Sequence, residues 1–407
     1  MAVYAPGTKW TVFQAGKPLV TTPKDGDIPS LALLSSSQIK SLLGDEIVFG
    51  QGENPKDSSE SSNESVLESC RFRGPPVVFL GLHEPEGTQA LPSSEFRTPE
   101  RTEDIPGVPY LSVDLSGIPA NQIETLLREA VDDDNNILSF EEPRSITQKF
   151  NMFEAAVFAE ARSMLDWNMR NKFCPGCGSR TYSLWGGWKL SCTSVLPWAN
   201  NVDREPCLTK TGLHNFHHPR TDPVIITAVL DEKGERILLG RNRKFPSGFY
   251  SVLAGFCEPG ESFEDAVKRE IWEESGIRVY NVKYHSSQPW PYPANLMVGC
   301  FASADSSQII RTDLDNELID CVLVEARWFT RAEVAAALAH PQGTVIRQAE
   351  YKRFDNDDDQ GGHVEPNIPP FRVPPRTAIA GVLITDWVAG KLGTTGGETV
   401  NNVKGNL

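Results

Sequence analysis

The chain has 407 residues, of which 39% are hydrophobic, enough for roughly two or three domains with their own cores. Its net charge of −15 disfavours a general nucleic-acid binder, but does not exclude recognition of a nucleotide at one RNA end. No stretch approaches the roughly 20 apolar residues of a membrane span, and no secretory segment begins at Met1. We therefore expect an intracellular protein that has no membrane segment.

The first part of the chain, residues 1–165, is predicted to form a domain of its own. Val77–Gly81 and Tyr110–Val113 are apolar and β-rich and predict strands. Residues 51–69 are rich in Ser, Glu and Asn, which predicts a disordered insertion. From Phe153 to Met169 the apolar residues recur at helical spacing, so a helix is expected to lead into the next segment.

Residues 166–215 are predicted to be a zinc ribbon. Thiolates suit tetrahedral zinc, and a short, glycine-rich segment with little core needs such a metal to fold. The alternative is a redox pair or buried thiols, but four cysteines in one short segment favour zinc. The expected ligands are Cys174, Cys177, Cys192 and Cys207. Cys207 is the weakest of them, and the alternatives for its place are His214, His217 and His218.

The last part of the chain, residues 216–407, is predicted to open with a β-hairpin. Val224–Leu230 and Ile237–Gly240 are apolar runs, and the turn-forming residues 231–234 separate them. Tyr250–Ala254 predicts a further strand, which enters the most informative segment of the chain.

That segment predicts a tight turn followed by a helix. Residues 258–261 read Glu-Pro-Gly-Glu, which is turn chemistry. Ser262 and Asp265 have the spacing of a capping box, and Gly276 supplies a C-terminal stop. We therefore expect a helix between Ser262 and Gly276.

The predicted helix carries three glutamates on one side. Glu270, Glu273 and Glu274 stand at i, i+3 and i+4, so their carboxylates crowd together. A solvated acidic helix face is the alternative for such a run. Magnesium or manganese would relieve the repulsion and bridge the oxygens of a pyrophosphate, while Arg269 would orient the carboxylates by bidentate pairing.

The spacing of these residues resembles the signature box of the Nudix hydrolases in every defined position. The resemblance implies an α/β/α sandwich with a mixed sheet, and hydrolysis of a nucleoside diphosphate linked to another group. It also implies that the carbonyl of Ala254 joins the metal site and that Phe256 stacks on the substrate. The matching positions are Gly255, Glu261, Arg269, Glu270, Ile271, Glu273, Glu274, Gly276 and Ile277.

Shortly downstream, three prolines alternate with two aromatic residues. Each proline fixes φ, so the segment is expected to be stiff and to present aromatic faces to a planar base. A proline-rich surface loop is the alternative. The array resembles the SQPWPFPxS element of the NADH pyrophosphatases, with Tyr292 in place of phenylalanine and Asn295 in place of serine. The implied substrate-binding residues are Gln288, Pro289, Trp290, Pro291, Tyr292, Pro293, Ala294 and Asn295.

The resemblance to zinc-containing NADH pyrophosphatases covers nearly the whole chain. It implies an α+β protein with an N-terminal Nudix-like domain that lacks the box, a zinc ribbon, and a C-terminal catalytic Nudix domain. Glu317 is the implied further metal ligand, and Glu325 is its rival. A helix over Thr377–Val388 would bring the backbone of Ala380 to the substrate, whereas residues 351–375 are expected to be a long surface excursion.

The implied reaction is hydrolysis of NADH and NAD⁺ to AMP and nicotinamide mononucleotide. It would use two or three magnesium or manganese ions, with Glu270, Glu273, Glu274, Arg269 and Glu261 as the catalytic group and one structural zinc ion. Removal of an NAD cap from RNA is the first alternative, and a non-catalytic nucleotide sensor is the second. The resemblance also favours a homodimer. The expected compartment is the cytoplasm, and the peroxisome stays an alternative although the C-terminal Gly405-Asn406-Leu407 matches a peroxisomal signal poorly.

Overall fold

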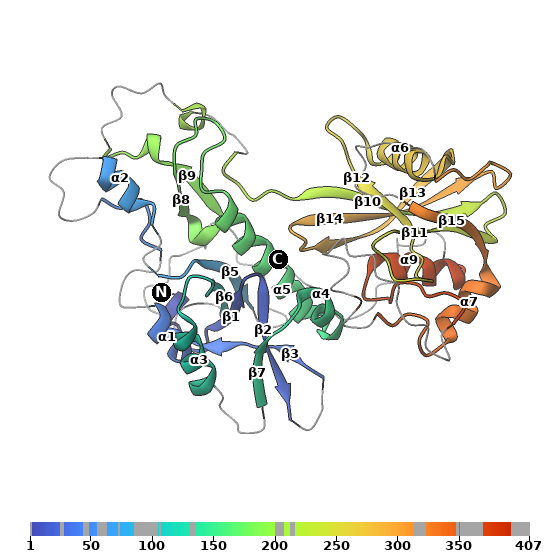
Figure 1. Cartoon of the computed structure of the whole chain (residues 1–407). Coiled ribbons are helices and arrows are strands. Elements are labelled where there is room, and N and C mark those ends of the chain that lie inside the picture. Colours follow the sequence, from blue (N-terminus) through green and yellow to red (C-terminus); the bar gives the residue numbers. More distant parts are fainter. Residues whose placement is uncertain are drawn as a thin grey trace. The chain divides into compact units, whose positions relative to one another are not determined.

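The computed structural model describes residues 2–24, 28–43, 49–54, 63–71, 74–84, 105, 107–130, 136–199, 207–211, 216–312, 323–346, 350 and 369–391. The chain divides into two compact units (Figure 1). The first comprises Met1–Arg220 and Pro291–Pro293, and the second comprises Thr221–Trp290 and Ala294–Leu407. The segment predicted as a ribbon thus groups with the first unit. The three-part division at 165 and 215 stays a prediction.

The first unit is built on a seven-stranded mixed sheet with the order β3-β2-β1-β6-β5, in which β4 pairs with β1 and β7 pairs with β2. The β1–β6 pair is parallel. The strands expected at 77–81 and 110–113 are confirmed as parts of β5 and β6. The bounds are β1 Lys9–Gln14, β2 Lys17–Pro23, β3 Ser30–Leu31, β4 Leu34–Ser35, β5 Val77–His83, β6 Val108–Asp114 and β7 Asn136–Phe140.

Helices cover both faces of this sheet. Alternating strand residues enter two different cores: Trp10 packs in the core that also holds residues of α1 and α3, whereas Phe13 packs with α5. The predicted helix before the cysteines is confirmed as α5, whose start is fixed by a capping box between Asn151 and Glu154. The helices are α1 Ser36–Leu43, α2 Asn63–Ser69, α3 Ala120–Glu129, α4 Pro143–Ile146 and α5 Met152–Arg170.

Helix α2 corrects part of the predicted disordered insertion. Ser65 and Ser69, which stand at i and i+4, are both buried, and the N–H of Gly52 donates to the carbonyl of Ser69. The residues after 62 are therefore ordered because one side of the helix is packed. Residues 55–62 of the insertion lie outside the described part of the chain.

The end of the first unit holds a small antiparallel sheet of β8 and β9. Its four-residue strands surround a short 3-10 turn, which suits a segment with little core of its own. The bounds are β8 Thr181–Leu184 and β9 Lys189–Cys192, with 3-10 turns at Ala2–Tyr4, Thr147–Lys149, Trp185–Gly187, Thr193–Val195 and Leu208–Lys210.

One carboxyl group of α5 predicts a pH-dependent stability. Oε1 of Glu160 is buried and has no hydrogen-bond partner among the described residues, and burial raises the pKa of this carboxyl to about 7. The pKa of Glu160 in the folded protein lies above the ordinary value of 4.5. The protonated carboxyl therefore contributes to the free energy of unfolding at low pH, and this contribution is lost as the pH rises through about 7. Glu160→Gln should therefore raise the free energy of unfolding at pH 8 by on the order of 1 kcal/mol.

At pH 5 the same substitution should leave the free energy of unfolding unchanged or lower it. Urea unfolding of both proteins at the two pH values measures the difference. An equal effect of the substitution at pH 5 and pH 8 would show that the carboxyl does not titrate in this way.

The second unit is a six-stranded mixed sheet with the order β13-β14-β10-β11-β15, with β12 paired to β10. The predicted hairpin is confirmed as β10 and β11, which pair antiparallel, whereas β10 and β14 pair parallel over ten residues. The expected strand at 250–254 is confirmed only at its end, in β12. The bounds are β10 Asp222–Asp231, β11 Arg236–Asn242, β12 Leu253–Phe256, β13 Val279–Trp290, β14 Asn295–Ala304 and β15 Leu323–Thr330.

Figure 1 shows α6 on one side of this sheet and α9 on the other. Along β10, Ile225 and Val229 pack against α6, while the alternate residues Ile226 and Leu230 pack against α7 and α9. Both faces are therefore buried, and the predicted α/β/α sandwich with a mixed sheet is confirmed. The helices are α6 Phe263–Ser275, α7 Arg331–Ala339 and α9 Ile379–Val388.

The end of the predicted surface excursion is in fact buried. Phe371 and Val373 belong to the core under α9, and the backbone of Arg372 bonds to Gly248 and Tyr250. Two apolar side chains in three residues explain why this piece packs inward. Residues 351–368 of the excursion lie outside the described part. Among the described helices, none is long and apolar enough to cross a membrane.

Candidate active site

The turn and helix of the informative segment form as the sequence predicts. The N–H of Glu261 donates to the carbonyl of Glu258 at 3.1 Å, closing the turn. Ser262 then caps α6 by accepting from the N–H of Asp265 at 3.2 Å. Gly276 ends the helix with a φ of 71°, a left-handed conformation that favours glycine.

Arg269 lies at the centre of the acidic group. Its Nε and Nη2 donate to the two oxygens of Glu261 at 2.6 and 2.8 Å, a bidentate pair. Nη1 lies 2.9 Å from Glu270 and 3.0 Å from Glu273, and Nη2 also donates to the carbonyl of Phe256 at 2.8 Å. Arg269 therefore fixes three carboxylates and the end of β12 relative to one another, the orienting role predicted from the sequence.

Gly255 allows the carboxyl of Glu270 to lie against the backbone of β12. A Cβ added to Gly255 would be 2.0 Å from Cδ of Glu270, closer than any real contact. The Glu270 side chain is buried, and burial raises its pKa, while Arg269 opposes that change. Glycine is therefore required at position 255 because the Glu270 side chain lies so close to the backbone, and not because this residue has a positive φ.

We expect Gly255→Ala to displace the Glu270 carboxyl and to lower hydrolytic turnover roughly 10²-fold, the scale for a misplaced reacting group. The matched control is Gly117→Ala, since a Cβ at Gly117 meets no atom within 4 Å. Steady-state kinetics of both variants measure the effect. Full turnover in Gly255→Ala would show that the tight Gly255–Glu270 approach is not needed.

Glu274 is the most deeply buried carboxyl of this group. Its Oε2 has no hydrogen-bond partner among the described residues. Burial raises the pKa of Glu274 well above its ordinary value, and the neighbouring Glu270 adds to the shift. A buried carboxylate beside like charges is stable when a cation neutralises it. The oxygen ligands at Glu270 and Glu274 fit a hard divalent cation.

The further metal ligand predicted at Glu317 lies outside the described residues. Its rival, Glu325, lies on β15, with one oxygen 4.0 Å from Nε of Arg241.

The predicted substrate residues of the second unit differ in how exposed they are. Phe256 is 57% exposed at the end of β12. Trp290 and Ala254 pack against the core that contains Ala380, which is buried in the first turn of α9. The side chain of Gln288 bonds to the backbone at the start of α9.

The proline-rich array is a strand followed by a turn, and not one continuous extended strip. Residues up to Trp290 belong to β13, residues 291–294 form the turn, and β14 starts at Asn295. Proline restricts φ but also suits turns, so the sequence pattern allowed both conformations.

Pro291–Pro293 groups with the first unit, where Tyr292 is enclosed by cations. The guanidiniums of Arg144 and Arg162 lie 4.2 and 4.8 Å from its ring centroid, and its hydroxyl is 3.3 Å from Oγ1 of Thr147. Arg162 also donates to the carbonyl of Pro291. The tyrosine that replaces phenylalanine thus gains a hydroxyl contact. Its contact with substrate stays a prediction.

The four predicted zinc ligands come together in the first unit, although they span 34 positions of the chain. Their sulfurs all lie within 4.8 Å of one another, a spacing that could hold one zinc ion. The weakest predicted ligand, Cys207, is 3.7 Å from Cys174. His217 is not in this set, but its Nε2 lies 3.1 Å from the sulfur of Cys174, a contact that orients this one ligand from outside the set.

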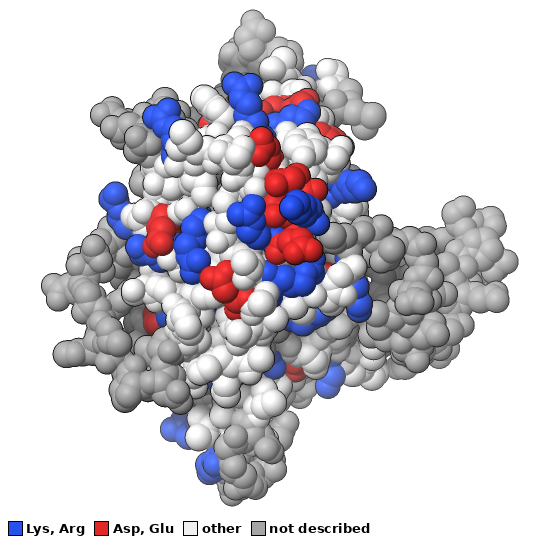
Figure 2. Space-filling model, turned by 90° about the vertical axis from the view of Figure 1, so that its right-hand side faces the viewer, with Lys and Arg blue, Asp and Glu red and all other residues white. Residues whose placement is uncertain are grey.

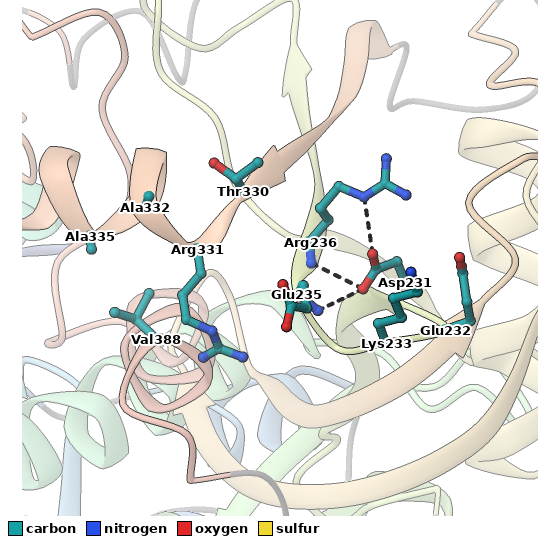
Figure 3. A pocket seen from close by; sticks show the side chains of 10 residues that line it. All are labelled: Asp231, Glu232, Lys233, Glu235, Arg236, Thr330, Arg331, Ala332, Ala335 and Val388. Atoms are coloured by element: carbon teal, nitrogen blue, oxygen red, sulfur yellow. Dashed lines mark hydrogen bonds and ion pairs between the residues drawn. The ribbon is translucent and has the colours of Figure 1, made fainter.

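A cavity of about 720 Å³ in the second unit lies away from these carboxylates (Figure 3). Asp231, which lines it, is five residues along β10 from the residue paired with Ala254, a separation of about 17 Å. Both arginines that line it are held by the protein: Arg236 pairs with Asp231 at 3.0 Å, and Arg331 donates to the carbonyl of Gly234 at 2.8 Å. We assign no catalytic role to this cavity.

Comparisons with known proteins agree with this geometry. The NUDIX domain model matches residues 219–349. The chain is 32% identical to the mouse NAD(P)H pyrophosphatase NUDT13, mitochondrial, covering 87% of the chain and 77% of the relative. It is 33% identical to the NAD-capped RNA hydrolase NPY1 of Saccharomyces cerevisiae, covering 67% and 68%. It is 43% identical to the NAD-capped RNA hydrolase NUDT12 of Macaca fascicularis, where the match spans 58% of the chain but only 42% of the relative.

Proposed function

Because the chain belongs to the Nudix hydrolases of the NADH pyrophosphatase type, we propose that it hydrolyses the pyrophosphate bond of NADH and NAD⁺ to AMP and nicotinamide mononucleotide. The observation that carries this proposal is the buried pair Glu270 and Glu274, of which Glu270 is held by Arg269 and lies against Gly255. Such an arrangement costs stability unless it binds cations, so a function explains it better than folding does.

The proposed ligands for two or three magnesium or manganese ions are Glu270, Glu274, Glu317 and the carbonyl of Ala254. Bound there, the cations would neutralise the pyrophosphate oxygens and acidify an attacking water. Glu273 and Glu261 would act through their ion pairs with Arg269, which keep the carboxylates oriented. The exposed ring of Phe256 offers a stacking surface next to this group.

A single structural zinc ion at the four cysteines is part of the same proposal. Three of the cysteines are buried, and among the described residues their cluster has one partly buried hydrophobic side chain packed against it, that of Val195, so little other core surrounds it. The metal would therefore supply the cohesion that apolar packing does not.

We also propose that the chain works as a homodimer. Sedimentation of the zinc-loaded protein measures its oligomeric state.

Removal of an NAD cap from RNA is the second candidate, favoured by the similarity to the yeast and macaque NAD-capped RNA hydrolases. The net charge of −15 works against binding the RNA body. On the face drawn in Figure 2, basic side chains are interspersed with acidic ones and form no continuous basic surface among the described residues. The charge therefore favours the free dinucleotide over capped RNA as the substrate.

Comparing kcat/KM for NADH with that for a short NAD-capped RNA separates the two functions. We expect the ratio to favour NADH and to change little between 50 and 200 mM salt, because few phosphates beyond the dinucleotide are bound. A higher value for capped RNA that falls steeply with salt would assign the cap as the substrate. Tight binding of NADH without hydrolysis would instead indicate a sensor.

A further inference from the structure

The edge strand β13 contains a bulge at His285. Tyr284 pairs with Cys300 and Ser286 pairs with Gly299, so the strand register shifts by one residue at His285. A bulge of this kind re-aims the side chain that it carries. The His285 side chain is only 4% exposed, and its Nε2 lies 3.3 Å from Oδ2 of Asp386 near the end of α9.

A second side chain of β13 holds the start of the same helix. Nε2 of Gln288 donates to the carbonyl of Thr377 at 2.9 Å, and the N–H of Ile379 donates to Oε1 of Gln288 at 2.8 Å. The first N–H groups of a helix have no partner within the helix. Gln288 therefore satisfies one of them and joins the chain before α9 to its first residue.

The two contacts are in register along the strand and the helix. His285 and Gln288 are three residues apart on β13, which is about 10 Å, and Ile379 and Asp386 are seven residues apart on α9, about 10.5 Å. The helix thus runs along the strand and is fixed at both ends. Gly299 of β14 allows the close approach, since an added Cβ would lie 2.8 Å from Cδ1 of Ile379.

We propose that His285 and Gln288 are positioning residues that fix α9, and through it Ala380, for binding of the dinucleotide. Ala380 is the second residue of α9 and packs in the same core as Ala254 and Trp290, so a shift of the helix start would also disturb these two proposed site residues. This inference rests on the proposed function, because it takes the dinucleotide as the ligand. It assigns a role to His285, which no sequence pattern indicated.

The test uses His285→Leu, which removes the contact with Asp386 from β13 and leaves Asp386 its ion pair with Arg376, and His285→Gln, which keeps a donor. We expect His285→Leu to raise KM for NADH about tenfold with kcat within about threefold, and His285→Gln to restore most of the loss. The fluorescence change on NADH binding without metal should weaken by the same factor. Tyr284→Ala is the matched control, because that neighbouring side chain is 60% exposed.

Amide hydrogen exchange of residues 379–382 tests the positioning without any substrate. It should be about tenfold faster in His285→Leu and in Gln288→Glu, which keeps the acceptor for Ile379 but loses the donor to Thr377. Unchanged exchange in both variants would overturn the positioning role. Faster exchange with an unchanged KM would overturn its link to the dinucleotide. Should the wild type neither bind nor cleave NADH, the proposed function fails, and the exchange data still decide the role of His285.

Discussion

Glu274→Gln is expected to lower kcat for NADH hydrolysis by at least roughly 10²- to 10³-fold, the range for losing one group that stabilises charge at a reacting centre. The substitution keeps the shape of the side chain but removes the charge of the most buried carboxylate of the group. Because the amide need not be neutralised by a cation, the fold should be as stable as the wild type, or more so, without metal. Product chromatography and thermal unfolding measure the two effects.

Glu264→Gln is the matched control, since Glu264 lies on the exposed side of the same helix. It should retain wild-type turnover. Wild-type turnover in Glu274→Gln would show that this carboxylate is not needed as a ligand of the catalytic cations. A large loss of stability in Glu274→Gln would show instead that Glu274 mainly supports the fold.

Cys192→Ser is expected to abolish zinc binding and to destabilise the first unit. Cys192 is fully buried and lies 3.3 Å from Cys177. Structural zinc contributes on the order of 10 kcal/mol of folding free energy in the smallest domains. A loss of even about 3 kcal/mol would lower Tm by roughly 6–12 °C in a unit of this size. Elemental analysis should find about one zinc per chain in the wild type and almost none in the variant.

The control for this substitution is Cys70→Ser, because Cys70 is a free thiol outside the cluster. It should keep both the zinc content and the Tm. A wild-type protein that contains no zinc, or a Cys192→Ser variant with an unchanged Tm, would contradict a structural zinc site.

The parts of the candidate site that follow from local sequence were predictable. The turn at Glu258–Glu261, the cap at Ser262 and the stop at Gly276 each depend on residues within four positions, and all three formed as expected. The crowding of the α6 glutamates follows from helical spacing alone. The gathering of four cysteines was predictable because soft ligands confined to a short segment indicate one metal.

The remaining features depend on pairings between distant residues. The contacts of Gln288 with Thr377 and Ile379 join positions about ninety residues apart, so no local pattern specifies them. The substrate contact of Gln288 stays a prediction. The bulge at His285 arises from the register between β13 and β14, which no local pattern specifies. The burial of Phe371 was missed for a related reason: its neighbours are proline-rich, while its packing partners lie elsewhere in the chain.

Incubating the purified protein with NADH and magnesium or manganese, and separating the products, decides whether the chain hydrolyses NADH. We expect AMP and reduced nicotinamide mononucleotide in equal amounts, formed only when the divalent cation is present. Intact NADH in the presence of the cation, from protein shown to be folded and loaded with zinc, would contradict it.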